Sequence, residues 1–448
     1  MSLVNDDALL FEPHMSGVHV SQTATTQGSV MRTMATLKQR WILLFLSVLS
    51  LPCSGQPVVK VGADVLLEGH LDVVLGKRVG IITNHTGKTA SGEFLTDALM
   101  ARGIRVVKLF GPEHGIRGEA EAGKKLDDGK DVKTGLPVIS LYGKNRKPTP
   151  GMLADVDVLL YDIQDVGARF YTYISTMILS MEAAAKAGIT FVVLDRPNPL
   201  GGILVDGPIL EDSLRSFVGI ASIPTVYGLT CGELATLANQ SGWLAENHFM
   251  TPRKDSALHA RLIVIPMEGW KRNMPWHETG LTWTPPSPNI PSDTSALAYA
   301  ATCYLEATNV SEGRGTARPF QIFGAPFVRA EELNTALNAL HLPGAGFRPL
   351  DFIPSTSKFK GEVCHGVEME IIDAGSFRPC MTGLSIIDAL RKLYSAEFTV
   401  TRSSFQRLFG SSRDLTMLLD HRNPGDIESG WQGELLKYKS DISRYLLY

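Results

Sequence analysis

The sequence predicts an α/β protein, in which a domain with a mostly parallel sheet is followed by a second, smaller α+β domain. Two observations predict the first domain. Between about residues 75 and 200, short apolar runs alternate with segments of helical spacing, which is typical of βαβ units. Each apolar run also leads into a polar or Gly/Pro-rich loop. Because ligands of open α/β sheets bind beyond the carboxyl ends of the strands, these loops predict the site.

The elements of the first domain follow from this alternation. Apolar runs predict strands over 79–83, 105–110, 136–142, 156–161 and 190–194. Helical spacing predicts helices over 94–101 and 173–187, and the glycines at 103 and 188 end them. We therefore expect these five strands to form a mostly parallel sheet, with a polar loop at the carboxyl end of each strand.

A Pro-rich stretch over 284–291 precedes the second domain. We predict a boundary near residue 293, which gives domains over 57–293 and 294–448. The second domain has a predicted helix over 295–306, a polar, glycine-spaced loop over 308–316, a strand over 366–372 and a helix over 383–394.

The composition of the 448 residues is that of an ordinary globular protein, with 44% hydrophobic and 20% charged residues. It excludes collagen-like, coiled-coil and mainly disordered chains. Lysine and arginine number 43 against 46 aspartates and glutamates, a net charge of −3, which argues against a nucleic-acid partner bound through a basic surface. Five cysteines without CxxC spacing support neither a disulfide scaffold nor a structural zinc site. We expect no cofactor.

Residues 1–56 are predicted to be a disordered extension followed by a signal peptide. Lys38 and Arg40 precede an apolar run over 41–51, and small residues follow near Cys53, which is the layout of a secretory signal. At 1.5 Å per residue this run spans about 16 Å, half of a bilayer's hydrocarbon core, so we expect no lasting transmembrane helix. We expect translation to start at Met34 and the mature protein to be exported, either periplasmic or secreted.

Two outcomes stay open for Cys53: it carries a lipid after cleavage, or cleavage falls just beyond it. The residues over 50–52 fit a lipobox poorly, and membrane contact is expected only through such an anchor. The other four cysteines could pair in an oxidising compartment; they are Cys231, Cys303, Cys364 and Cys380. No oligomeric state is predicted.

The candidate substrate-binding residues are polar, charged or aromatic, and most of them follow a predicted strand. They are Asn84, His85, His114, Arg117, Tyr142, Asp162, Gln164, Asp165, Arg169, Asn198, Asn289, Glu312 and Arg314. Guanidinium forks suit a ligand carboxylate or phosphate, although each loop arginine, including Arg196, could instead pair with a nearby aspartate. The asparagines next to Gly or Pro are either turn residues or ligand contacts.

Glu113 is the predicted catalytic acid. It lies in a Gly-Pro-Glu-His-Gly turn, where the glycines permit close backbone approach. A carboxyl group in such a partly desolvated turn has a raised pKa and stays protonated near neutrality. Glycoside hydrolysis needs this kind of acid, usually with a second carboxylate opposite. The candidates for the second carboxylate are Glu119, Asp162, Asp165 and Glu312; alternatively, Glu113 is a loop carboxylate that binds backbone N–H groups.

A catalytic metal is a rival interpretation of the same loops. His85 and His114 could bind one together with Asp162 and Asp165. However, no HxH or HExxH spacing occurs, and these candidates come from three separate loops. A GxSxG nucleophile elbow and a GxGxxG dinucleotide motif are also absent after the strands. We therefore expect no metal.

These loops resemble the motifs of the NamZ-type exo-β-N-acetylmuramidases, glycoside hydrolase family 171. The matching blocks occur in the family's order over residues 80–87, 110–119, 134–138, 140–143, 162–173, 195–199, 306–316 and 445–448. The resemblance extends over roughly residues 60–448. The sequence departs from the family pattern at Ala168, and at Tyr227, where the family pattern has histidine.

The resemblance implies a Rossmann-like domain, a smaller C-terminal domain that closes a cleft, and release of N-acetylmuramic acid from the non-reducing end of peptidoglycan fragments. The family's proposed catalytic glutamate falls on Glu113. The partner would be a peptidoglycan-derived saccharide, whose lactyl carboxylate gives the loop arginines a ligand. Two alternatives are a non-catalytic periplasmic sugar- or muropeptide-binding protein and a metal-dependent hydrolase.

Overall fold

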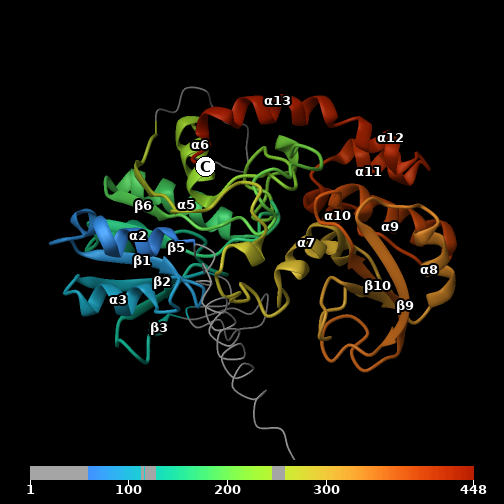
Figure 1. Ribbon diagram of the computed structural model, residues 1–448, viewed down its shortest axis with the longest axis horizontal. Coiled ribbons are helices and arrows are strands. Elements are labelled where there is room, and N and C mark those ends of the chain that lie inside the picture. The colour runs from blue at the N-terminus through green and yellow to red at the C-terminus, as the bar shows by residue number, and fades with distance from the viewer. Residues whose placement is uncertain (1–58, 113–115, 117–127, 245–257) are drawn as a thin grey trace, which may run out of the picture. The chain divides into compact units, whose positions relative to one another are not determined.

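The computed structural model describes residues 59–112, 116, 128–244 and 258–448, and these residues form two sheets (Figure 1). The larger sheet has seven strands in the order β3-β4-β2-β1-β5-β6-β7. Every neighbouring pair in it is parallel except β3 with β4. The strands are β1 (Val79–Thr83), β2 (Val106–Gly111), β3 (Gly129–Lys130), β4 (Pro137–Ser140), β5 (Val158–Asp162), β6 (Thr190–Leu194) and β7 (Arg261–Ile265). The predicted fold class is confirmed.

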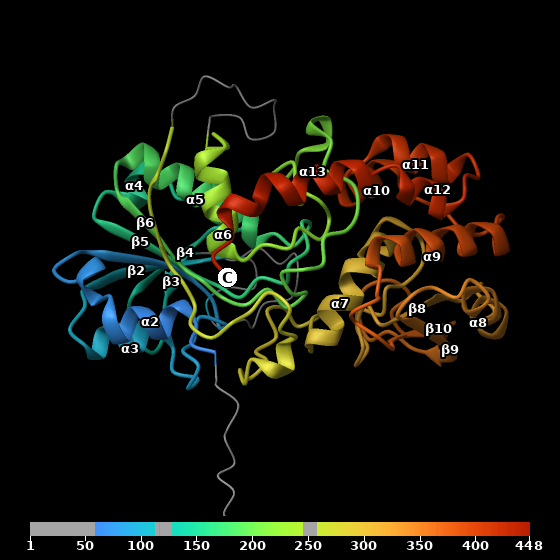
Figure 2. The same ribbon diagram turned by 45° about the horizontal axis from the view of Figure 1, so that its top comes forward.

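Helices cover both faces of the seven-stranded sheet, because alternate side chains of each strand point to opposite faces. Ile81 packs in a core cluster with α2 and α3, whereas Ile82 packs in the cluster that contains α5 and α6. Figure 2 shows α2 and α3 on one side of the sheet and α4 and α5 on the other. These helices are α2 (Gly62–Gly69), α3 (Leu95–Ala101), α4 (Pro150–Leu153), α5 (Tyr173–Ala187) and α6 (Cys231–Gln240).

The helix α5 has the predicted bounds and the predicted end signal. Gly188 follows it in the left-handed region, at φ 67°, and its amide donates to the carbonyls of Ala184 and Ala185. Only glycine adopts this conformation without steric cost. Residues of α5 from Tyr173 to Ala184 are all buried, so this helix anchors the loop that precedes it.

The direction of strand succession reverses between β1 and β5. The chain adds β2 and β4 on one side of β1, and then returns to add β5, β6 and β7 on the other. Such a topological switch point leaves a crevice beyond the carboxyl ends of the two central strands. Residues 84–88, 163–165 and 195–198 follow the ends of β1, β5 and β6, so the sequence-predicted loops lie at this edge.

The C-terminal part contains an antiparallel sheet in the order β8-β10-β9. Its strands are β8 (Ile322–Ala325), β9 (Ala345–Phe352) and β10 (Cys364–Ile371). The predicted helix over 295–306 is α7 (Asp293–Thr302) followed by a 3-10 turn. The remaining helices are α8 (Ala330–Asn338), α9 (Pro379–Leu393), α10 (Arg402–Phe409), α11 (Ser412–Leu419), α12 (Pro424–Ser429) and α13 (Gln432–Ile442).

The four cysteines outside the N-terminal segment are free and buried, so no disulfide forms among the described residues. Cys380, for example, lies 3.3 Å from the Tyr304 hydroxyl rather than near another sulfur. Within the described ranges, no helix is both long and apolar enough to cross a bilayer.

Candidate functional site

Hydrogen bonds join the loops after β1 and β5 at the switch point. The Thr83 hydroxyl donates to the carbonyl of Asp162 over 3.0 Å. The amide of Gln164 donates to Thr86 Oγ1 over 2.9 Å, and this hydroxyl donates in turn to Asn84 Oδ1 over 2.6 Å. The Asn84 side chain also accepts the Thr86 amide, at 2.9 Å, as is typical of an Asx turn. The predicted site residues Asn84, Asp162 and Gln164 therefore lie together.

The Pro-rich stretch is anchored on the same loops. Asn84 Nδ2 donates to the Tyr173 hydroxyl over 3.0 Å, and this hydroxyl donates to the carbonyl of Pro286 over 2.8 Å. His85 Nε2 lies 2.6 Å from the carbonyl of Pro285, a contact that requires the proton on Nε2. Asn289, farther along this stretch, is half-buried, and its amide donates to Ser287 Oγ over 3.3 Å.

An ion pair connects the ends of β5 and β6. Arg196 Nε donates to Asp162 Oδ1 over 2.7 Å, and the two side chains are 7% and 0% exposed. The second Asp162 oxygen, Oδ2, is buried without a hydrogen-bond partner in the part of the chain that the structure describes. Burial raises the pKa of Asp162, and the guanidinium of Arg196 opposes that rise. Gly87 allows this packing, because a Cβ there would lie 2.1 Å from Thr83 Oγ1.

Asp165 is a buried carboxyl group with a raised pKa. It accepts hydrogen bonds from the Tyr227 hydroxyl and from the amide of Gly167, the latter at 2.8 Å. Burial raises the pKa of Asp165 to about 6, against the effect of the Tyr227 hydrogen bond. Tyr227, where the sequence departs from the family pattern, is 1% exposed. Its hydroxyl therefore donates a hydrogen bond to Asp165 and does not lie at an open surface.

The side-chain amides of Gln164 and Asn198 stabilise these loops through hydrogen bonds within the fold. Gln164 Nε2 donates to the carbonyls of Asp165 and Pro197, at 2.9 and 2.7 Å. Asn198 Nδ2 donates to the carbonyl of Leu229 over 2.9 Å, and its Oδ1 accepts the amide of Leu200. Asn198 is 5% exposed, so both of its polar atoms are used within the fold.

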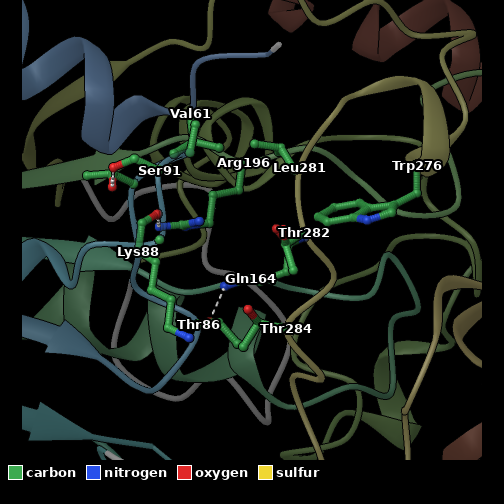
Figure 3. A pocket seen from close by; sticks show the side chains of 13 residues that line it. Val61, Thr86, Lys88, Ser91, Gln164, Arg196, Trp276, Leu281, Thr282 and Thr284 are labelled. Atoms are coloured by element: carbon green, nitrogen blue, oxygen red, sulfur yellow. Dashed lines mark hydrogen bonds between the residues drawn. The ribbon is translucent and has the colours of Figure 1, made fainter.

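A polar cavity lies against this network (Figure 3). It encloses about 180 Å³ and is lined by the loops after β1, β5 and β6 together with residues between 276 and 284. Gln164 and Arg196 contribute to its wall. Lys88 also lines it, and the sequence did not single it out; its only signal was its position directly after the Asn84–Gly87 turn.

The predicted acid Glu113, together with His114 and Arg117, lies outside the described residues. Ile116, the one described residue of this segment, lines a small cavity of about 10 Å³ with Asn84 and Phe94. Ile116, in the loop after β2, therefore lies near the loop after β1.

A second cluster of charged side chains lies in the C-terminal part. Arg314 pairs with Glu306 at 2.6 Å and with Glu312 at 3.2 Å, and Lys358 reaches Glu312 at 3.1 Å. Glu312 is buried, whereas Glu306 and Arg314 are partly exposed. Burial raises the pKa of Glu306, and the charge of Arg314 opposes it. The half-buried Glu306 is a carboxylate that the sequence interpretation did not select.

Aromatic rings connect the charged residues around Arg314 with the loops at the switch point. Tyr173, which bonds Asn84, packs edge-to-face on Tyr171 with ring centres 4.8 Å apart. Tyr171 packs on Tyr299 of α7 at 6.0 Å, and Tyr299 on Phe320 at 4.7 Å. The guanidinium of Arg314 lies 5.0 Å from the centre of the Phe320 ring. Residues from both predicted domains thus share one aromatic cluster.

Two predicted site residues lie apart from these groups. Arg169 is fully buried, and its guanidinium donates to four backbone carbonyls, those of Pro208, Ile223, Leu408 and Phe409. Burial lowers the pKa of Arg169 to about 10. Tyr142 follows β4 and is half-buried, and its amide donates to Ser140 Oγ over 3.3 Å. Among the described residues, no three His, Cys, Asp or Glu side chains cluster as metal ligands would.

Comparisons with known proteins agree with this arrangement. The model of the N-terminal part of exo-β-N-acetylmuramidase NamZ matches residues 79–294, and that of the C-terminal part matches residues 297–448. Peptidoglycan β-N-acetylmuramidase NamZ of Bacillus subtilis (strain 168) is 44% identical over 395 residues, which are 88% of this chain and 92% of the relative. Two DUF1343 family proteins from Bacteroides fragilis NCTC 9343 have crystal structures that match with TM-scores of 0.78 and 0.71. Their identities are 39% and 30%, and each match covers 87% of this chain and 99% of the other.

Proposed function

The chain belongs to the NamZ family of exo-β-N-acetylmuramidases, and we propose that it releases N-acetylmuramic acid from the non-reducing end of peptidoglycan fragments, with Glu113 as the general acid. The observation that carries this proposal is the match of both family models, one after the other, over residues 79–448 with a gap of two residues. The protein is a glycosidase that acts on peptidoglycan-derived saccharides.

The position of Glu113 in the chain supports its role. It follows the carboxyl end of β2 by two residues, and β2 is the neighbour of β1 on one side of the switch point. An acid at this edge can protonate the oxygen that leaves with the next sugar. A second carboxylate about 5–5.5 Å away would give retention of configuration, and one about 6.5–9.5 Å away would give inversion. The substrate's acetamido group is a further candidate for the second role.

Among the described carboxylates, Glu306 fits the second role better than the two buried aspartates do. Asp162 is bonded to Arg196, and Asp165 to Tyr227, and both are at most 5% exposed. Glu306 is partly exposed and lies beside Arg314, at the end of the aromatic cluster that reaches Asn84.

A disaccharide pair tests the activity and its direction. The protein is incubated with N-acetylmuramyl-β-1,4-N-acetylglucosamine and, in parallel, with the disaccharide of reversed order. We expect equal amounts of both free sugars from the first and none from the second, because only the first has muramic acid at its non-reducing end. Binding without cleavage of either would instead favour a sugar-binding protein. Activity that is lost on exhaustive chelation and restored by a metal would favour a metal-dependent hydrolase.

We also propose that the protein is exported after cleavage of a signal peptide within residues 1–56. The charged residues at 38 and 40 and the apolar run over 41–51 support this. Mass spectrometry of the mature N-terminus tests the proposal. A start at Cys53 with added lipid mass would identify an anchored form, and an intact N-terminal segment would contradict export by this route.

A further inference from the structure

The charged side chains that the structure describes in the wall of the cavity at the carboxyl ends of β1, β5 and β6 are all positive. Of the thirteen lining residues that the structure describes, five are Ser or Thr, one is Gln, two are the cations Lys88 and Arg196, and none is Asp or Glu. A ligand in this cavity meets hydrogen-bond donors and positive charge. Such surroundings favour an anion, since charge-assisted hydrogen bonds are the stronger ones.

Arg196 is held rigidly in the wall. Its Nε donates to Asp162 and its NH2 to the carbonyl of Lys88, each over 2.7 Å, and the side chain is 7% exposed. A guanidinium has five N–H donors, and these two are the only ones with a described partner. Figure 3 shows the side chain reaching toward Lys88. The fork is therefore oriented before a ligand arrives, which lowers the entropic cost of binding.

Lys88 supplies a positive charge that no described carboxylate neutralises. Asp162 offsets the charge of Arg196, whereas the Lys88 ammonium forms no ion pair with any described residue and lies 5.0 Å from the Phe94 ring centre. Its backbone is fixed, because its amide donates to the carbonyl of Thr86 over 2.8 Å and its carbonyl accepts Arg196.

Trp276 is a further residue of the wall. Its side chain lines the cavity and is 8% exposed, and its Nε1 is buried without a hydrogen-bond partner in the described ranges. A buried donor without a partner costs free energy.

We propose that this cavity, the Lys88–Arg196 pocket, binds the lactyl carboxylate of N-acetylmuramic acid and so distinguishes this sugar from N-acetylglucosamine. The inference rests on the proposed function and deepens it, because it names the group that selects the sugar. The two sugars differ only in the lactyl ether on the ring, whose carboxylate is charged near neutrality. A pocket with one cation that pairs with no described carboxylate and an oriented guanidinium fork matches that group.

Binding of three sugars tests the pocket without relying on turnover. N-acetylmuramic acid, its neutral lactyl amide and N-acetylglucosamine are titrated into the protein and followed by calorimetry. We expect the acid to bind about tenfold or more tightly than the amide, since hydrogen bonds to charged groups contribute the most. In Lys88→Met this preference should disappear, while the affinities for the amide and for N-acetylglucosamine stay unchanged. Lys439→Met, an exposed lysine on α13, is the matched control and should behave as wild type.

Kinetics of the same variants add a second readout. On a chromogenic β-N-acetylmuramide, Lys88→Met should raise KM with kcat nearly unchanged, because the ground state and the transition state both carry the lactyl group. Arg196→Lys keeps the charge and loses the fork, and should fall between wild type and Lys88→Met in its preference for the acid.

The outcomes separate this inference from the proposed function. If the wild type cleaves the muramide but its preference for the acid is absent, or survives in Lys88→Met, the pocket assignment is wrong and the function stands. If the Lys88-dependent preference is found and no β-muramide is cleaved, the proposed function is wrong and the pocket stands.

Discussion

Arg196 and Asp162 form a 2.7 Å ion pair at the carboxyl ends of β6 and β5, and the two side chains are 7% and 0% exposed. The pair ties together the two strands on one side of the switch point, and it orients the guanidinium beside the polar cavity. A buried pair of this kind is costly to break, because the remaining charge has no water to solvate it.

Arg196→Met should therefore destabilise the protein by about 3–5 kcal/mol, the usual cost of leaving one buried charge unpaired. Denaturant unfolding near pH 7 measures this. The control is Lys60→Met, which removes the solvent-exposed pairs with Glu68 and Glu268 and should destabilise the protein far less. Equal effects of the two substitutions would show that the buried pair has no special role.

The raised pKa of Asp165 predicts a pH-dependent stability. Its folded pKa of about 6 exceeds the unfolded value of about 3.9, so the folded state holds the proton more tightly. The carboxyl group therefore destabilises the fold increasingly as pH rises from about 4 to about 6, by roughly 2–3 kcal/mol in total.

Asp165→Asn isolates this contribution from those of other groups. The free energy of unfolding of Asp165→Asn minus that of wild type should rise by that amount between pH 4 and pH 7. Asp195, whose pKa burial also raises to about 6, is present in both proteins and cancels. A difference that stays flat with pH would contradict the assignment.

Tyr173→Phe tests the link between the loop after β1 and the Pro-rich stretch. The hydroxyl connects Asn84 Nδ2 with the carbonyl of Pro286, so its removal should cost about 1–3 kcal/mol of stability. We expect kcat/KM on a β-muramide to fall about tenfold, because the site depends on positioned loops. Tyr394→Phe, whose hydroxyl bonds the backbone of Arg329, should keep kcat/KM within about twofold. An unchanged kcat/KM in Tyr173→Phe would show that activity does not depend on this hydroxyl.

Arg169→Met tests whether this family-motif arginine stabilises the fold or binds substrate. Four backbone carbonyls accept its hydrogen bonds, so their loss should destabilise the protein by at least about 3 kcal/mol, with KM unchanged for the folded fraction. Arg407→Met on the exposed side of α10 is the control and should leave the unfolding midpoint unchanged. A large rise in KM with normal stability would instead place Arg169 at the substrate.

The fold was predictable where burial determines the sequence pattern. β1, β6 and α5 have the predicted bounds, because strands buried on both faces are continuous apolar runs and a left-handed glycine ends the helix. The strand β7 was not predicted. It is an edge strand whose first four residues are exposed or half-buried, so it carries no such apolar run.

The residue types at the site were predictable, but the hydrogen bonds and ion pairs that each of them forms were not. Asn84 and Asp162 were selected because they follow strands, and they lie together at the switch point. The pairing of Asp162 with Arg196 joins two strand ends, and no local pattern encodes it. A loop arginine that binds carbonyls, such as Arg169, has the same local sequence signal as one that binds a ligand. The position of Lys88 after a turn did not single it out, because a lysine after a turn is most often solvated.

The central claim, that Glu113 protonates the departing sugar, is tested most directly by Glu113→Gln with substrates of differing leaving groups. We predict that hydrolysis of the natural disaccharide falls by about 10²–10⁴-fold, whereas a β-muramide with an activated phenol, which leaves without a proton, is affected far less. The exposed Glu434→Gln is the control. A Glu113→Gln protein that cleaves the disaccharide at the wild-type rate would contradict the claim.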